Sequence, residues 1–311
     1  MILVQCPVRI SLIGGGSDRD DYLRVHKRGS VLSFTPNLYT YVSLSIDYIG
    51  RNSVNHKYVI SYSRREEVTH PNQIQNQLVK EFLMYFNAPP AGLFLTSDIF
   101  ADGSGLAVSS AYSCALSMAL DQISGGALHQ IELAKIAHQI EKKINPNLGF
   151  QDIYGCAIGG FKKISFSINT EPTYSFLPHK IFRAFTPYLI YTGVNRKSTD
   201  VLETYKVPNT DSLNGLVDLA EEQLLSEKYS DFFDTIKQGW LEKKLFSNEI
   251  LSNERLAEID FELTKNSNCL AHKLCGAGNG GFFLAFFNTN YNPGLDFKKI
   301  NISNNGVRRI L

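Results

Sequence analysis

The chain has 311 residues, of which 31 are Lys or Arg and 30 are Asp or Glu, so its formal net charge is +1. This balance argues against a general nucleic-acid binder, which usually carries a basic surplus on one face. A hydrophobic fraction of 43%, with 20 Phe and 15 Tyr, excludes a disordered or fibrous chain. Five scattered cysteines, none at metal-ligand spacing, indicate a reducing compartment.

In chain order, the first predicted elements are strands separated by turns, over residues 1–63. A helix is predicted over 73–86, because apolar residues recur on one helical face before Pro89-Pro90. There follow a strand over 92–97, a glycine-rich turn, a helix over 111–120, an amphipathic helix over 132–143 and a strand over 161–168. Two charge-free stretches, 103–120 and 274–295, contain too much glycine and too many polar residues for a membrane span, so we expect a cytoplasmic protein.

After the Glu171-Pro172 break, the pattern predicts a strand over 188–193 and three helices around 212–227, 230–246 and 254–266. Further strands are predicted around 282–287, 296–302 and 307–311. Blocks of strands and helices alternate without an internal repeat. This indicates an α+β fold with two domains, 1–170 and 171–311.

Three segments concentrate glycine with Ser, Asp or Asn: IGGGSD (13–18), DGSGLAVSSA (102–111) and CGAGNGG (275–281). Glycine lets the backbone approach a ligand closely, although a single such loop is more often only a turn. The second segment delivers its amides to a helix N-terminus, where free N–H groups and the helix dipole favour phosphate. No Lys follows these glycines, so Ser109 and Ser110 either offer a hydroxyl to magnesium or cap the helix.

Asp152 and Arg9 each have two interpretations. Asp152 lies in a Gly-flanked segment eleven residues after Glu141, where it serves either as a turn former or as a base for an attacking hydroxyl. Arg9 lies in an apolar segment; it needs an anionic partner if it points inward, and otherwise it faces solvent on an edge strand. The seven histidines lack zinc-site spacing, and His129 and His138 are predicted at the surface, whereas Trp240 is predicted in the core.

The three glycine segments, with Glu141 and Asp152 between the second and the third, resemble the GHMP kinase superfamily. Its first motif is matched by Pro7, Arg9 and 14–18, its phosphate loop by 103–111, and its third motif by 273–281. Within it, the chain is similar to the D-glycero-D-manno-heptose 7-phosphate kinases, in the segments 14–18, 151–154, 191–198, 239–244 and 305–308.

The resemblance implies a two-domain α+β kinase with its active site at the domain interface, ATP and magnesium as cofactors, and a sugar phosphate as substrate. Such an enzyme phosphorylates the anomeric hydroxyl of the heptose 7-phosphate and yields the 1,7-bisphosphate, for nucleotide-activated heptose in lipopolysaccharide or capsule synthesis. It acts as a monomer or homodimer, without nucleic-acid or membrane partners.

The resemblance also implies roles for individual residues. The catalytic pair is Asp152 as base and Arg9 as the neighbouring cation, and the magnesium ligands are Ser109 and Glu141. The nucleotide phosphates lie on Gly103, Ser104, Gly105, Leu106, Ala107, Val108, Ser109 and Ser110. The acceptor lies against Gly15, Gly16, Ser17, Asp18, Gly276 and Gly278. The group that holds a distal phosphate stays open among Arg19, Arg24, Lys162, Arg196 and Lys197.

The phosphate loop departs from the family pattern. Ala101-Asp102 replaces a Pro-Pro pair and Ala107-Val108 replaces Gly-Ser, while Asn279 stands at a motif-three glycine. Ala107 is expected to be strained if φ is positive there. Two alternatives therefore stay open: an anomeric kinase for another sugar, such as fucose or a modified heptose, and a degenerate relative that binds sugar phosphate or nucleotide without turnover.

Overall fold

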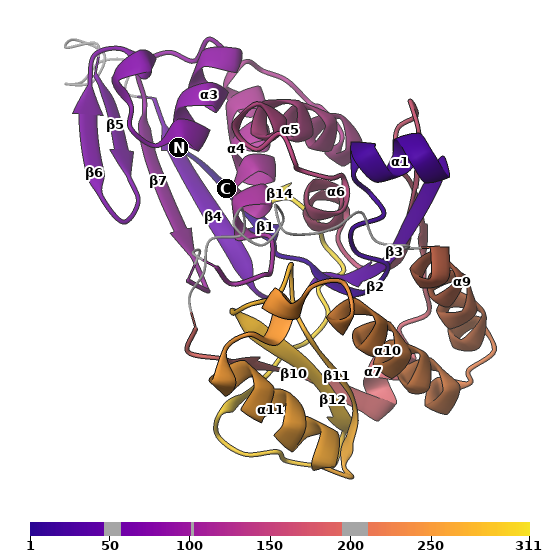
Figure 1. Ribbon diagram of the computed structural model, residues 1–311. Coiled ribbons are helices and arrows are strands. Elements are labelled where there is room, and N and C mark those ends of the chain that lie inside the picture. Colours follow the sequence, from indigo (N-terminus) through magenta and orange to yellow (C-terminus); the bar gives the residue numbers. More distant parts are fainter. Residues whose placement is uncertain (47–56, 101–102, 195–210) are drawn as a thin grey trace.

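The computed structural model describes residues 1–46, 57–100, 103–194 and 211–311, and its helices and strands form three sheets with covering helices (Figure 1). The largest sheet has the strand order β14-β1-β4-β7-β5-β6. Its strands are β1 (Ile2–Pro7), β4 (Tyr39–Ser45), β5 (Tyr58–Ser61), β6 (Arg65–Val68), β7 (Gly92–Ser97) and β14 (Arg308–Arg309). Helix α4 packs against β1 and β4, and α3, α5 and α6 lie beside α4 (Figure 1).

The helices of this layer follow from the sequence with shifted ends. They are α3 (Gln77–Tyr85), α4 (Val108–Ile123), α5 (Gln130–Ile144) and α6 (Gln151–Ile158). The helix predicted over 73–86 begins later, because Asn76 caps it by accepting from the Val79 N–H, and a short 3₁₀ helix η1 (Pro71–Gln73) precedes it.

A second sheet, in the order β2-β3-β8-β9, connects motif one to the middle of the chain. It contains β2 (Ile10–Ile13), β3 (Arg28–Phe34), β8 (Phe161–Ser167) and β9 (Thr173–Phe176). Between β2 and β3 lies a helix, α1 (Asp20–His26), where only strands and turns are predicted. Acidic residues in its first turn and basic residues in its last turn complement the helix dipole, which stabilises so short a helix.

The third sheet, in the order β11-β12-β10-β13, belongs to the second half of the chain. It contains β10 (Phe185–Tyr191), β11 (Cys269–Leu274), β12 (Phe282–Asn288) and β13 (Phe297–Lys299). The remaining elements are α7 (Ile181–Ala184), α9 (Asp211–Leu225), α10 (Tyr229–Lys244), η2 (Asn248–Leu251) and α11 (Glu254–Lys265). Helices α10 and α11 pack on β11, and Trp240 is buried between them and the sheet, as predicted.

Backbone pairing connects the two predicted domains. Strand β9 pairs with β8, and β14 pairs with β1 as the edge strand of the largest sheet. The domain boundary at residue 170 therefore stays a prediction, because two of the sheets combine strands from both sides of it. In the part of the chain that has been placed, no helix is both long and apolar enough to cross a bilayer.

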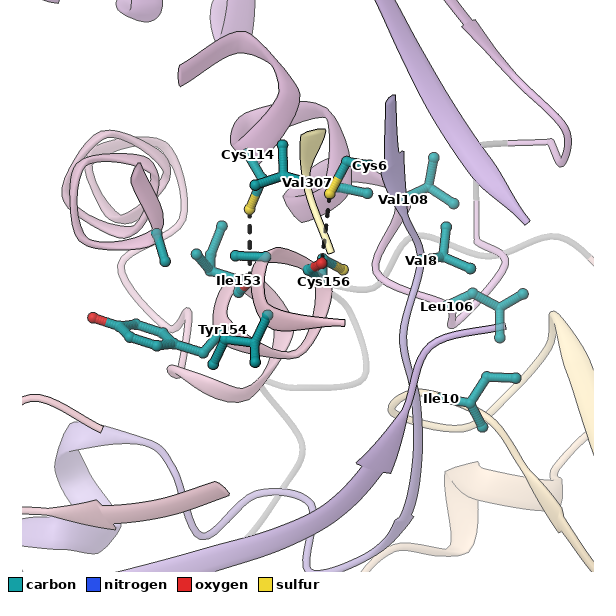
Figure 2. Close-up of a cluster of buried hydrophobic side chains, with 14 of the residues drawn as sticks. Cys6, Val8, Ile10, Leu106, Val108, Cys114, Ile153, Tyr154, Cys156 and Val307 are labelled. Atoms are coloured by element: carbon teal, nitrogen blue, oxygen red, sulfur yellow. Dashed lines mark hydrogen bonds between the residues drawn. The ribbon is translucent and has the colours of Figure 1, made fainter. Parts of the chain in front are cut away.

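The largest core includes residues of α4 and α6 and contains four thiols, of which Figure 2 shows Cys6, Cys114 and Cys156. The Cys6 thiol donates to the Cys156 carbonyl at 3.7 Å, and the Cys114 thiol donates to the Ile153 carbonyl at 3.5 Å. Burial raises the pKa of the Cys6 and Cys156 thiols. These thiols therefore pack as apolar groups that join β1, α4 and α6, and thus support the strand that leads to Arg9.

The prediction that His138 lies at the surface is wrong. Its side chain is 8% exposed and stacks on Phe150, with ring centroids 4.4 Å apart. Phe150 comes from the segment that precedes α6, so the pattern of α5 alone does not show this cover. Burial, with a smaller contribution from the nearby Lys142, lowers the pKa of His138 to about 4, against the opposing charges of Asp20 and Glu171.

We expect His138→Phe to reduce the loss of unfolding free energy that accompanies a fall in pH. Because the folded pKa lies below the ordinary value of about 6.5, the unfolded chain binds the extra proton, and stability is lost as the pH falls from about 6.5 towards 4. Urea unfolding at pH 7 and pH 5 tests this. The wild type should lose more stability than the variant between the two pH values, and equal losses would show that His138 does not titrate in this way.

Candidate active site

A cleft of about 420 Å³ lies where the three glycine segments meet. Most predicted site residues line it: Arg9, Gly15, Gly16, Asp18, Gly103, Ser104, Gly105, Ala107, Val108, Ser109, Ser110, Glu141, Asp152 and Gly276. Three other predicted positions, Ser17, Leu106 and Gly278, lie outside the lining formed by the described residues. The Ser17 hydroxyl is buried and donates to the Gly14 carbonyl at 2.9 Å, so this side chain stabilises the motif-one turn.

The loop before α4 has the backbone conformation of an anion cradle. Gly103 and Gly105 have φ of 68° and 75°, a region that glycine enters without strain. A Cβ at Gly105 would lie 2.6 Å from the Cys275 carbonyl oxygen, and one at Gly281 would lie 2.4 Å from that of Ser104. Motif three therefore holds the phosphate loop by direct backbone contact, and both glycines are required for it.

Ala107, the last loop residue before α4, adopts the left-handed conformation, with φ 62° and ψ 41°. The strain expected there is thus present, and the backbone keeps the path that a glycine would allow. The Cys156 thiol donates to the Ala107 carbonyl at 3.7 Å, and the Arg9 N–H donates to the Leu106 carbonyl at 3.1 Å. These contacts keep the loop in place although Ala107 stands where the family pattern has glycine.

We expect Ala107→Gly to stabilise the protein by about 0.5–1 kcal/mol, because glycine removes the left-handed strain and loses part of the gain to its more flexible unfolded state. Ala111→Gly is the matched control: it lies in α4, where glycine should cost about 1 kcal/mol. Urea unfolding measures both. Destabilisation by both substitutions would contradict the assignment of strain to Ala107.

Arg9 points inward and has the anionic partner that an inward orientation requires. It is 4% exposed, and its Nε and Nη2 donate to Asp152 Oδ1 at 2.9 and 2.6 Å. Its Nη1 donates to the Gly105 carbonyl at 2.9 Å, so one guanidinium group connects the carboxylate to the phosphate loop. Asp152 lies in the first turn of α6, and its Oδ2 has no hydrogen-bond partner among the described residues. This oxygen is available to accept a proton.

Asp18 holds the N-terminus of the same helix. Its Oδ2 accepts from the Gln151 N–H at 2.9 Å, and Gly149 leaves room for it, since a Cβ there would lie 2.0 Å from Oδ2. Asp18 is 2% exposed, and burial raises its pKa to about 6, with a smaller contribution from Asp152. The motif-one carboxylate thus fixes where α6 begins and thereby where Asp152 lies.

Glu141 forms a second buried polar group in the cleft wall. Its Oε1 accepts from Ser109 Oγ at 2.8 Å and from Ser110 Oγ at 3.3 Å, and its Oε2 accepts from Ser113 Oγ at 2.8 Å. Burial raises the pKa of Glu141 to about 7, against these hydrogen bonds. A hydroxyl and a carboxylate are the hard oxygen ligands that magnesium prefers, so Ser109 and Glu141 have the chemistry to bind such an ion.

The distal-phosphate candidates fall in different places. Arg19 lines the cleft and pairs with Asp21 at 2.7 Å, whereas Lys162 is fully buried elsewhere and donates to the Gly159 and Gly160 carbonyls. Arg24 lies in the last turn of α1. Arg196 and Lys197, like Asp102, lie outside the described residues.

Several lining residues were not predicted as site residues, among them Ser11, Gln151, Lys243 and Lys273. Lys273 begins the segment 273–281 that matches motif three, and Gln151 directly precedes Asp152. Nothing in their own spacing distinguishes them from ordinary polar residues. The one available signal is that Gln151, Lys243 and Lys273 lie within segments that carry the family resemblance.

The chain is similar to several known kinases. Residues 73–160 match the family model of the GHMP kinases N terminal domain. The chain is 27% identical over 307 residues to the D-glycero-alpha-D-manno-heptose 7-phosphate kinase of Campylobacter jejuni, covering 92% of this chain and 89% of that protein. It superposes on a D-glycero-D-manno-heptose 1-phosphate kinase from Bacteroides thetaiotaomicron, with a TM-score of 0.74, 20% identity and coverage of 99% and 98%. It also superposes on the Streptococcus pneumoniae phosphomevalonate kinase in complex with phosphomevalonate and AMPPNP, with a TM-score of 0.74, 14% identity and 92% coverage of both chains.

Residues 73–160 therefore form a GHMP kinase N-terminal domain, and the whole chain has the fold of the kinases on which it superposes. The α+β fold expected from the sequence is confirmed over nearly the whole chain. The resemblance to the GHMP kinases and the enzyme class that it implies are confirmed as well.

Proposed function

We propose that the protein is an ATP-dependent sugar-phosphate kinase that phosphorylates the anomeric hydroxyl of D-glycero-D-manno-heptose 7-phosphate to give the 1,7-bisphosphate. The observation that carries this proposal is the Arg9–Asp152 pair, which joins a carboxylate with an unpartnered oxygen to the phosphate loop. The name of the Campylobacter relative supports the heptose 7-phosphate as acceptor.

In this mechanism, Asp152 Oδ2 takes the proton of the anomeric hydroxyl while that oxygen bonds to the γ-phosphorus of ATP. The bond from the γ-phosphorus to the β,γ-bridging oxygen breaks, and ADP leaves with the electron pair. Arg9 stabilises the charge of the transferring group, and the amides of 103–110 orient the nucleotide phosphates. Ser109 and Glu141 would hold the magnesium ion, which neutralises phosphate charge when bound.

A panel of acceptors tests the proposal: heptose 7-phosphate, unphosphorylated heptose, mannose 6-phosphate and fucose, each with magnesium and ATP. Phosphorus NMR should show a new anomeric phosphate ester with heptose 7-phosphate at the highest kcat/KM. A higher kcat/KM for fucose or another sugar would favour an anomeric kinase of different specificity. Acceptor binding without any turnover would favour the degenerate relative, although the intact path of the loop at Ala107 weighs against it.

Glu141→Gln is expected to weaken magnesium-nucleotide binding about tenfold or more, since a ligating charge is lost while the hydrogen bonds to serine can still form. Calorimetry with magnesium-AMPPNP measures this, and AMPPNP without magnesium is the control. Equal loss of binding with and without the ion would show that Glu141 supports the loop and does not hold the metal.

We propose further that the enzyme acts in the cytoplasm and supplies nucleotide-activated heptose for surface glycans such as lipopolysaccharide or capsule. Its five free cysteines, four of them buried, suit a reducing compartment.

A further inference from the structure

One wall of the cleft carries three polar side chains that the mechanism above does not use. Ser11 lies on β2, Gln151 begins α6, and Lys273 lies near the end of β11, so three separate elements contribute them. All three line the cleft on the side of the motif-one turn. We call Ser11, Gln151 and Lys273 the polar wall.

Lys273 is a buried cation without an acidic partner among the described residues. It is 6% exposed, and its ammonium donates to the carbonyls of Ser11 and Leu12 at 2.9 and 2.8 Å. An ammonium has three protons, so one remains for a ligand. Burial lowers the pKa of Lys273 to about 8, and the group is therefore still charged at neutral pH. A buried charge is costly unless an anion pairs with it.

Gln151 carries a buried acceptor atom that lacks a hydrogen-bond donor. Its Oε1 is buried and has no hydrogen-bond partner within the described part of the chain. A Cβ placed on Gly15 would lie 3.5 Å from this oxygen and 3.9 Å from Ser11 Oγ, so both polar atoms converge on the surface of Gly15. A buried acceptor without a donor costs free energy that a ligand hydroxyl can recover.

We infer that the polar wall recognises the acceptor: Gln151, with Ser11 beside it, binds acceptor hydroxyls next to the reacting one, and Lys273 binds an oxygen of the acceptor's own phosphate. This inference rests on the proposed function, in which the acceptor is a phosphorylated sugar. The contacts of Lys273 with the Ser11 and Leu12 carbonyls connect it to motif one, whose turn would lie against the acceptor.

Lys273→Met and Gln151→Leu test the two parts of the wall. For Lys273→Met, we expect the Kd of heptose 7-phosphate to rise about ten- to a hundredfold, since a charge-assisted hydrogen bond is lost, with a smaller change for the unphosphorylated heptose. For Gln151→Leu, we expect a rise of about three- to tenfold for both sugars. The Kd of magnesium-AMPPNP, measured by calorimetry, should stay within about twofold of the wild type in both variants.

Lys162→Met is the matched control for Lys273→Met. Lys162 is also buried and also donates to two backbone carbonyls, but it lies outside the cleft. It should lower thermal stability without changing the Kd of either sugar. Gly15→Ala adds a second test that preserves the fold, because a methyl group there makes only ordinary contacts yet covers the Gln151 amide; it too should weaken acceptor binding.

The inference is overturned if the folded Lys273→Met, Gln151→Leu and Gly15→Ala variants bind the acceptor as the wild type does. It is also overturned if Lys273→Met weakens AMPPNP binding and leaves the acceptor unaffected, because the phosphate at Lys273 would then belong to the nucleotide. If the wild type binds heptose 7-phosphate without turnover, the kinase proposal fails while the binding comparison still decides on the wall. If it binds no sugar phosphate, both fail.

Discussion

Substitution of Asp152 by Asn should lower kcat by about a hundred- to ten-thousandfold, the range that a positioned general base contributes. An amide cannot take the acceptor proton, yet its oxygen can still accept from Arg9, so the contact with the phosphate loop should persist. We therefore expect the Kd values of magnesium-AMPPNP and of the acceptor to change little. Steady-state kinetics together with calorimetry separate these effects.

Asp98→Asn is a suitable control for this variant. Asp98 also accepts hydrogen bonds, from the Tyr39 N–H at 2.9 Å, but it does not line the cleft, and its substitution should leave kcat unchanged. A kcat of Asp152→Asn within tenfold of the wild-type value would show that Asp152 is not the catalytic base.

Arg9→Met should have the largest effect on stability, about 1–3 kcal/mol, because it removes the buried partner of Asp152, whose side chain is 28% exposed. It leaves Asp152 Oδ1 and the Gly105 carbonyl without these donors, and the phosphate loop loses the side chain that joins Gly105 to Asp152. Guanidinium unfolding measures the change. We also expect kcat to fall, since the cation beside the transferring group is lost.

The double variant Arg9→Met/Asp152→Asn distinguishes charge from packing. If the cost of Arg9→Met comes from the unpaired carboxylate, then neutralising Asp152 should recover about 1 kcal/mol or more, within the usual coupling range for residues in contact. Additive free energies of unfolding would mean that the packing of the arginine stem, and not its charge, is what stabilises the fold.

The sequence predicted the fold class and most elements because local patterns determine them. The amphipathic helices and the β-branched strands are visible in short windows, and glycine loops mark the turns between them. Helix α1 was missed because its helical signal is the distribution of charge over seven residues within a segment rich in strands. His138 was placed wrongly because the ring that covers it, Phe150, comes from another element.

The residues of the candidate site are also of two kinds: some are predictable from local sequence patterns, and others depend on residues far away in the chain. Residues within the glycine motifs could be predicted because a close backbone approach demands glycine, as the contact between Gly105 and the Cys275 carbonyl shows. The sequence left two orientations open for Arg9, because its inward orientation depends on the ion pair with Asp152, which is 143 residues away. The polar wall escaped prediction although Gln151 and Lys273 lie within segments that carry the family resemblance, because the sequence does not show that they line the same cleft as Ser11.

The hydrogen bond from the Gln151 N–H to Asp18 has a consequence for redesigning acceptor preference. The motif-one turn and the helix that carries Asp152 share this buried contact, so we expect that neither can be exchanged without the other. A motif-one turn grafted from a relative with another substrate should move the base unless residues 149–151 are transplanted with it. Libraries that vary both segments together should therefore contain more active variants than libraries that vary the turn alone.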